Sequence, residues 1–78
     1  MNSIKWQDYI VQDAQILFGK PSIKGTRIPV DLIVEKLACG ETITGLLEDY
    51  PRLTEAAIYA CLHFAADNIR SLPLAEAA

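Results

Sequence analysis

The segment from Gly19 to Val30 limits the fold of this chain more than any other part of the sequence. Two glycines and two prolines lie close together in it, at Gly19, Pro21, Gly25 and Pro29. Proline lacks an amide donor and glycine favours turns, so neither a helix nor a long strand fits until the segment ends. We therefore expect an ordered loop or hairpin tip that leads into a helix, with the glycines and prolines setting the path of the backbone.

The same segment is cationic in an acidic chain. It carries Lys20, Lys24 and Arg27 and no carboxylate before its end, whereas the whole chain has a formal net charge of −3. A functional interpretation is that these three cations contact phosphate or an acidic surface. The structural alternative is that Arg27 pairs with Asp31 or Glu35 and that the segment only directs the chain.

Length and composition indicate a single small domain over residues 1–78. A chain this short buries only about 60% of its unfolded surface, so a partner or a second copy is expected to help its stability. The hydrophobic fraction of 51% excludes a disordered tail. Apolar runs are too short to span a membrane, and the N-terminus lacks the features of a leader segment. We expect no membrane partner and a cytoplasmic location.

A β-hairpin and the cationic loop are expected within residues 6–30. The apolar triplets at 9–11 and 16–18 predict two short strands around a polar turn. The segment 27–30 is compatible with a further strand against 16–18, but Pro29 confines it to an edge or a strand end.

Three helical segments follow, with readable ends. Apolar periodicity predicts them at 30–39, at 43–49 and at about 55–71. Gly40 offers a left-handed C-cap to the first helix, and Thr42 an N-cap to the second.

Together these segments predict a mainly α fold, a three-helix, homeodomain-like helix-turn-helix bundle over 30–71, preceded by the short hairpin and followed by a tail at 72–78. In such a motif the third helix is the one that reads DNA. Arg52, Thr54 and Tyr59 lie at the turn before that helix and in its first turns, which makes them candidate contacts with nucleic acid or another partner. The start of the helix offers no Arg, Asn or Gln to a base edge, so a purely structural core helix is an equal alternative.

The core-facing stripe of the third helix is expected to comprise the residues that follow the helical period, Ile58, Cys61, Leu62, Ala65 and Ile69. The helix carries more apolar residues than this one stripe needs. A second apolar side predicts homodimerisation or docking onto another protein. Phe64 and Tyr59 are the expected anchors of this interface, with His63 beside them.

The sequence offers little for catalysis or metal binding. His63 is the only histidine, and it lies among apolar neighbours. Cys39 and Cys61 are isolated in the sequence, and one histidine with two cysteines is too few for a four-ligand zinc site. We expect both cysteines in the core, and no catalytic residue, metal or cofactor.

The chain resembles domain-of-unknown-function family 433, a group of small prokaryotic antitoxin-like proteins, from about Tyr9 to about Ala66. The matching runs are Gly19-Lys20-Pro21, Ile23-Lys24-Gly25-Thr26-Arg27-Ile28-Pro29-Val30, Leu37-Ala38-Cys39-Gly40-Glu41 and Tyr50-Pro51-Arg52-Leu53-Thr54. The chain departs from the pattern at Phe18, where the family often has a second glycine. Many antitoxins use a long C-terminal arm, whereas only residues 72–78 follow the third predicted helix here. We therefore expect any toxin contact to use the folded body or the N-terminal segment.

The resemblance implies the antitoxin half of a type II toxin-antitoxin pair, with a PIN-like ribonuclease toxin and operator DNA as partners and a homodimer as the binding form. Our first hypothesis is accordingly a non-enzymatic antitoxin-like regulator that binds DNA and neutralises a toxin. The alternative is a DNA-independent protein-interaction or dimerisation module. An enzyme fragment is the least favoured interpretation.

Overall fold

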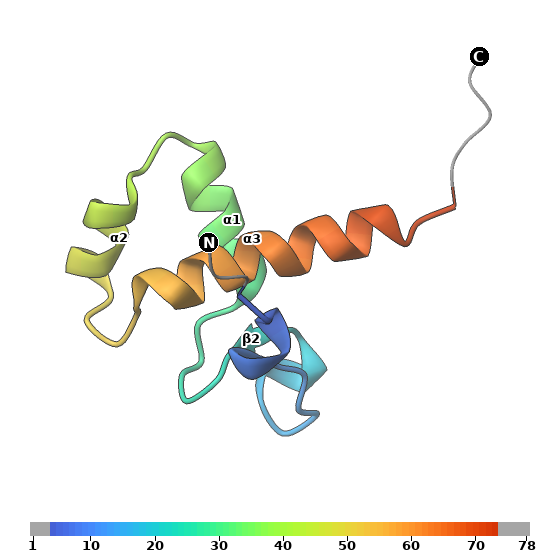
Figure 1. The fold of residues 1–78 in the computed structure, drawn as a ribbon. Coiled ribbons are helices and arrows are strands. Elements are labelled where there is room, and N and C mark those ends of the chain that lie inside the picture. The colour runs from blue at the N-terminus through green and yellow to red at the C-terminus, as the bar shows by residue number, and fades with distance from the viewer. Residues whose placement is uncertain (1–3, 74–78) are drawn as a thin grey trace, which may run out of the picture.

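The computed structural model describes residues 4–73. Within them, three helices follow a small antiparallel sheet: α1 (Val30–Ala38), α2 (Ile43–Asp49) and α3 (Glu55–Arg70) (Figure 1). This arrangement confirms the predicted mainly α fold, a small helical bundle preceded by a short hairpin. Of the predicted tail, residues 74–78 lie outside the described part. None of the described helices combines the length and the apolar character that crossing a membrane requires.

The hairpin pairs different residues from those predicted. Strand β1 (Ile10–Val11) pairs with β2 (Ser22–Ile23), with Ile10 opposite Ile23. The predicted strand at 16–18 is wrong, because this region forms a 3₁₀ turn, η2 (Leu17–Gly19). Its first two residues have φ angles of 50° and 57°, in the left-handed region where a strand cannot continue.

The chain returns beside the sheet at the end of the cationic loop, as the sequence suggested, but its partner is β2. Pro29 forms an isolated bridge with Ser22. On either side of this bridge, the amide of Ile23 donates to the carbonyl of Ile28 and the amide of Val30 donates to that of Pro21, both at 2.9 Å. Pro29 needs no amide at this edge position, which is where a proline is tolerated.

The helix ends carry the caps predicted at Thr42 and Gly40, and Thr54 caps α3 as well. The Thr42 hydroxyl accepts a hydrogen bond from the Gly45 amide at 3.0 Å, and the Thr54 hydroxyl accepts one from the Ala57 amide at 3.1 Å. Gly40 ends α1 with a φ of 95°. These local interactions satisfy amides that a helix leaves unpaired, and they explain why the predicted helix bounds agree with the structure to within one residue.

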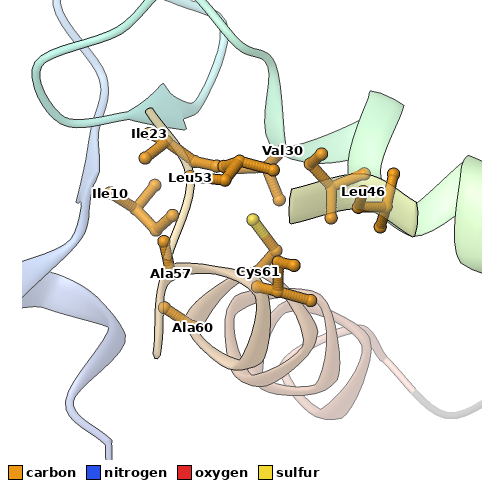
Figure 2. Close-up of a cluster of buried hydrophobic side chains, with 10 residues drawn as sticks. Ile10, Ile23, Val30, Leu46, Leu53, Ala57, Ala60 and Cys61 are labelled. Atoms are coloured by element: carbon orange, nitrogen blue, oxygen red, sulfur yellow. The ribbon is translucent and has the colours of Figure 1, made fainter. Parts of the chain in front are cut away.

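Helix α3 is the central element, because η1 (Trp6–Asp8), β1, α1 and α2 all contact it. Figure 2 shows side chains from the hairpin, α1, α2 and α3 pointing toward one another. The buried apolar side chains are Ile10, Ile23, Val30, Ile33, Leu46, Leu53, Ala57, Ile58, Ala60 and Cys61.

The two cysteines have different environments. Cys61 is buried in this core, and burial raises the pKa of its thiol to about 12. The expectation that Cys39 is also a core residue is wrong, because Cys39 is exposed. It follows the last residue of α1, where the chain turns away from the core toward Gly40, and its thiol donates to Glu35 Oε2 at 3.6 Å.

Trp6, in the N-terminal segment, packs against the C-terminal half of α3 and forms a hydrogen bond with it; we call this contact the clasp. The Trp6 indole N–H donates to Asp67 Oδ2 at 2.7 Å, and the Trp6 ring meets the Phe64 ring edge to face with centroids 4.8 Å apart. Arg70 also donates to Asp67. The hydrogen bond from Trp6, followed by that from Arg70, lowers the pKa of the Asp67 carboxyl. Phe64 is therefore partly buried by a side chain of its own chain.

Candidate interaction surfaces

A groove lies between the tip of the cationic loop and the turn that joins α2 to α3. Its volume is about 640 Å³. We call it the arginine groove; its lining residues are Ile16, Gly25, Thr26, Arg27, Ile28, Asp49, Tyr50, Pro51 and Arg52. Two candidate contact residues that are far apart in the sequence, Arg27 and Arg52, thus line the same hollow.

Local interactions fix the loop side of this groove. The Thr26 hydroxyl donates to the Ile23 carbonyl at 2.7 Å and accepts from the Ile28 amide at 3.0 Å. Gly25 has a φ of 78°, which a residue with a side chain adopts only under strain. The resulting tight turn places Arg27 between two residues whose backbone is held by hydrogen bonds.

The helix side is fixed by the turn between α2 and α3. The Leu53 amide donates to the Tyr50 carbonyl at 2.8 Å, and the Leu53 side chain is buried in the core. Pro51 and Arg52 are exposed between these two anchors. The turn therefore presents Arg52 on the surface directly before α3.

The groove carries a local excess of positive charge. Within residues 4–73, Asp49 is the carboxylate among the lining residues, against two guanidinium groups. No ion pair between described residues uses Arg27 or Arg52. The groove therefore has charged donors available for an anionic ligand.

The other cations of the predicted site are placed differently. Asp31, the proposed partner of Arg27, instead pairs with Lys20 at 3.0 Å. This pair borders a smaller cleft of about 240 Å³ between the start of α1 and the middle of α3, away from the arginine groove. Lys24 is exposed beside Gly25 at the loop tip. The structure thus separates Lys20 from Arg27, and Lys24 lines neither of the two hollows.

The residues expected to shape the loop lie at its turning points. Gly19 has a φ of 86°, and with Gly25 it adopts the left-handed conformation. Pro21 supplies the carbonyl that accepts from Val30, and Pro29 forms the bridge to β2. Thr54, a candidate contact residue, caps α3 with its hydroxyl, which gives that side chain a structural task.

A second surface runs along the exposed side of α3. At about 100° per residue, the members of this set fall within one stripe of the helix. We call it the α3 face; its residues are Glu55, Tyr59, Leu62, His63, Ala66, Ile69 and Arg70, all exposed to solvent. Its apolar members are substantially open, with Ile69 68% exposed and Tyr59 and Leu62 each 39% exposed.

Only part of this surface was predictable from the sequence. Of the three predicted interface residues, Tyr59 and His63 lie on the α3 face, whereas Phe64 packs on Trp6. Leu62 and Ile69 were counted with the core by their helical spacing and were missed as surface residues. They lie at the edge of the core stripe, where their exposure depends on how far other elements cover α3.

Side chains that could bind a metal ion do not gather in the described part of the chain. Between residues 4 and 73, no three His, Cys, Asp or Glu side chains are close enough to hold one metal ion. His63 is exposed on the α3 face.

The chain is similar to the members of one protein family. A family profile described as "Protein of unknown function (DUF433)" matches residues 10–65. A crystal structure of a DUF433 member protein from Anabaena variabilis superposes with a TM-score of 0.76 at 31% sequence identity, covering 82% of this chain and 63% of that one. The chain thus spans less than two thirds of the length of this solved relative. No match was found among the curated proteins.

Proposed function

Since the chain belongs to the DUF433 family, whose description assigns no activity, we propose a function from the surfaces themselves: a non-enzymatic, antitoxin-like regulator that binds an anionic macromolecule at the arginine groove. The observation that carries this proposal is the convergence of Arg27 and Arg52, without ion-pair partners in the described chain, on one groove. Operator DNA is the proposed anion, and a PIN-like ribonuclease toxin is the proposed protein partner.

The position of the groove suits contact with a phosphate backbone. It lies at the turn between the second and third helices of a trihelical arrangement, directly before α3. Guanidinium groups bind phosphate oxygens with two parallel hydrogen bonds, and such contacts need positive charge only locally. The overall net charge of −3 opposes long-range attraction to DNA, so the binding is expected to be weak and sensitive to salt.

We do not expect α3 to contact the edges of DNA bases. Its outward side begins with Glu55 and continues with Tyr59 and Leu62. These side chains lack the donor patterns that pair with base edges in the major groove. The apolar character of the α3 face instead favours the alternative hypothesis for this surface, a protein-interaction or dimerisation module.

The test is binding of a fluorescent duplex, taken from the DNA upstream of the gene, by fluorescence anisotropy across a salt series. We expect affinity to fall as salt rises, and the double variant Arg27→Gln/Arg52→Gln to flatten the slope of log K against log salt by about 1 to 2. Lys5→Gln is the matched control, because Lys5 is an exposed cation outside the groove.

Two results would contradict the proposal. One is the absence of binding at low salt by the folded protein. The other is an equal loss in Lys5→Gln and in the groove variant, since that would point to diffuse charge in place of a site. The toxin assignment is tested separately, by assaying any protein that co-purifies from the native host for ribonuclease activity that the purified chain suppresses.

A further inference from the structure

We propose that the α3 faces of two copies of this chain pack against each other as antiparallel helices, related by a twofold axis that passes between Leu62 and His63. The proposal concerns a different surface from the arginine groove and does not depend on it. It commits the exposed side of α3 to a second copy of the chain.

The first support is the chemistry of the face. Its open apolar side chains include Tyr59, Leu62 and Ile69, which form a continuous stripe over several turns. A helix that is apolar on the side away from its own core is typical of an interface. Nucleic acid suits this stripe poorly, because the stripe exposes apolar side chains and begins with an acid, Glu55.

The second support is the distribution of charge along the face. Glu55 lies in the first turn of α3 and Arg70 in the last. Fifteen steps of about 1.5 Å separate them by about 22 Å along the helix. In an antiparallel pair centred between Leu62 and His63, Glu55 of each copy lies opposite Arg70 of the other. A parallel pair would bring like charges together at both ends, so charge selects the antiparallel direction.

The same register also matches large side chains with small ones. Tyr59 lies opposite Ala66 of the second copy at two symmetric places, and Leu62 of each copy lies beside Leu62 of the other at the axis. A large residue over a small one lets two helices approach closely. A twofold axis requires each residue to find its complement on an identical surface, and this face meets that condition with its own sequence.

Phe64 is not an anchor of this interface, although the sequence suggested it. Its ring is held edge to face against Trp6 of the same chain. Trp6 is in turn hydrogen-bonded to Asp67, which faces the N-terminal segment. The clasp covers one side of the C-terminal half of α3 and leaves the α3 face as its uncovered side.

The test is sedimentation equilibrium of the full chain from about 1 to 200 µM, with circular dichroism to verify folding. We expect a monomer–dimer equilibrium for the wild type and at least a tenfold weaker association for Leu62→Asp. Phe18→Asp is the matched control, since Phe18 is a fully exposed apolar side chain outside the α3 face. It should leave the dissociation constant unchanged.

A charge swap tests the register without disturbing the core. Glu55→Arg alone places two cations at each end of the pair, and we expect it to weaken association about tenfold. Arg70→Glu also breaks the pair with Asp67, so this single variant is measured too. The double variant Glu55→Arg/Arg70→Glu restores opposite charges across the pair, and it should associate more tightly than the added effects of the two single changes predict. A double variant that associates no more tightly than that would overturn the antiparallel register.

The remaining outcomes are equally decisive. A wild type that stays monomeric to 200 µM overturns the proposal. A Leu62→Asp variant that dimerises as tightly as the wild type overturns it too. If the wild type stays monomeric, a different protein becomes the expected partner of the α3 face. A toxin that binds the wild-type monomer but not the Leu62→Asp variant would be identified as that partner. DNA binding through the arginine groove is measured independently, so failure of the dimer and failure of the proposed function give different results.

Discussion

Replacing Phe18 with glycine is expected to stabilise this protein, although it deletes a large apolar side chain. Phe18 has a φ of 57° and is 102% exposed relative to its reference state. Its side chain therefore contributes no buried area, while its backbone occupies the left-handed region that only glycine adopts freely. The substitution removes strain and sacrifices no packing.

The magnitude follows from two opposing effects. A non-glycine residue in the left-handed conformation costs about 1 to 2 kcal/mol, and glycine costs about 0.5 to 1 kcal/mol in extra freedom of the unfolded chain. The difference is a net gain of about 0.5 to 1 kcal/mol in the free energy of unfolding. For a domain of this size, that gain raises Tm by about 2 to 8 °C.

Thermal unfolding followed by circular dichroism, at one fixed protein concentration, measures this shift. Gly25→Ala is the opposite control: Gly25 has a φ of 78°, and an added Cβ would meet no atom within 4 Å. Its loss of about 1 to 2 kcal/mol would come from backbone conformation alone. A lower Tm for Phe18→Gly would refute the reasoning, because it would mean that the Phe18 side chain makes a contact that stabilises the folded protein.

Three further outcomes follow from contacts in the fold. Thr54→Ala removes the N-cap of α3 and should lower the free energy of unfolding by about 1 kcal/mol, whereas serine at the same position should retain most of it, as measured by urea denaturation. In the native protein a thiol reagent at pH 8 should modify exposed Cys39 first and buried Cys61 only on unfolding, as counted by absorbance. Because the hydrogen bond to Glu35 raises the pKa of the Cys39 thiol, Cys39 should react more slowly than a free thiol. The pKa of Asp67 is lowered in the folded state, so its contribution to stability is present above about pH 4 and is lost as pH falls through the folded pKa. Because Asp67 accepts a hydrogen bond from Trp6, the fluorescence emission of Trp6 should change in that acidic range and not near pH 6.

The sequence predicted the helices well because their ends are decided locally. A threonine at Thr42 or Thr54 caps a helix with its own side chain, and Gly40 ends one through its own backbone. Each of these signals acts within a few residues. The first helix and the last were therefore placed to within one residue of the observed bounds.

The strands were harder because pairing depends on contacts elsewhere in the chain. The apolar run at 16–18 matched a strand pattern, but the backbone turns there through two left-handed residues. Ile10 instead finds Ile23 across the sheet, and both side chains enter the core under α3. Burial of Ile23 decided the partner, and periodicity within a short run carries no information about it.

The candidate surfaces were predictable residue by residue but not as sites. Charge and turn composition identified Arg27 and Arg52 separately, yet their convergence follows from how the hairpin folds back beside the turn before α3. For the α3 face, helical spacing grouped Ile69 with the core, although the helix extends past the elements that would cover it (Figure 1).

The most direct test of the arginine groove as the anion-binding site is residue-level mapping by NMR. A ¹⁵N-labelled sample of the chain would be titrated with the upstream duplex at low salt, then with added salt. We predict that the amide shifts cluster at 25–28 and 49–52, on the two sides of the groove, and that salt reverses them. Shifts confined to the outward side of α3, or spread evenly over exposed cations such as Lys5, would contradict the account.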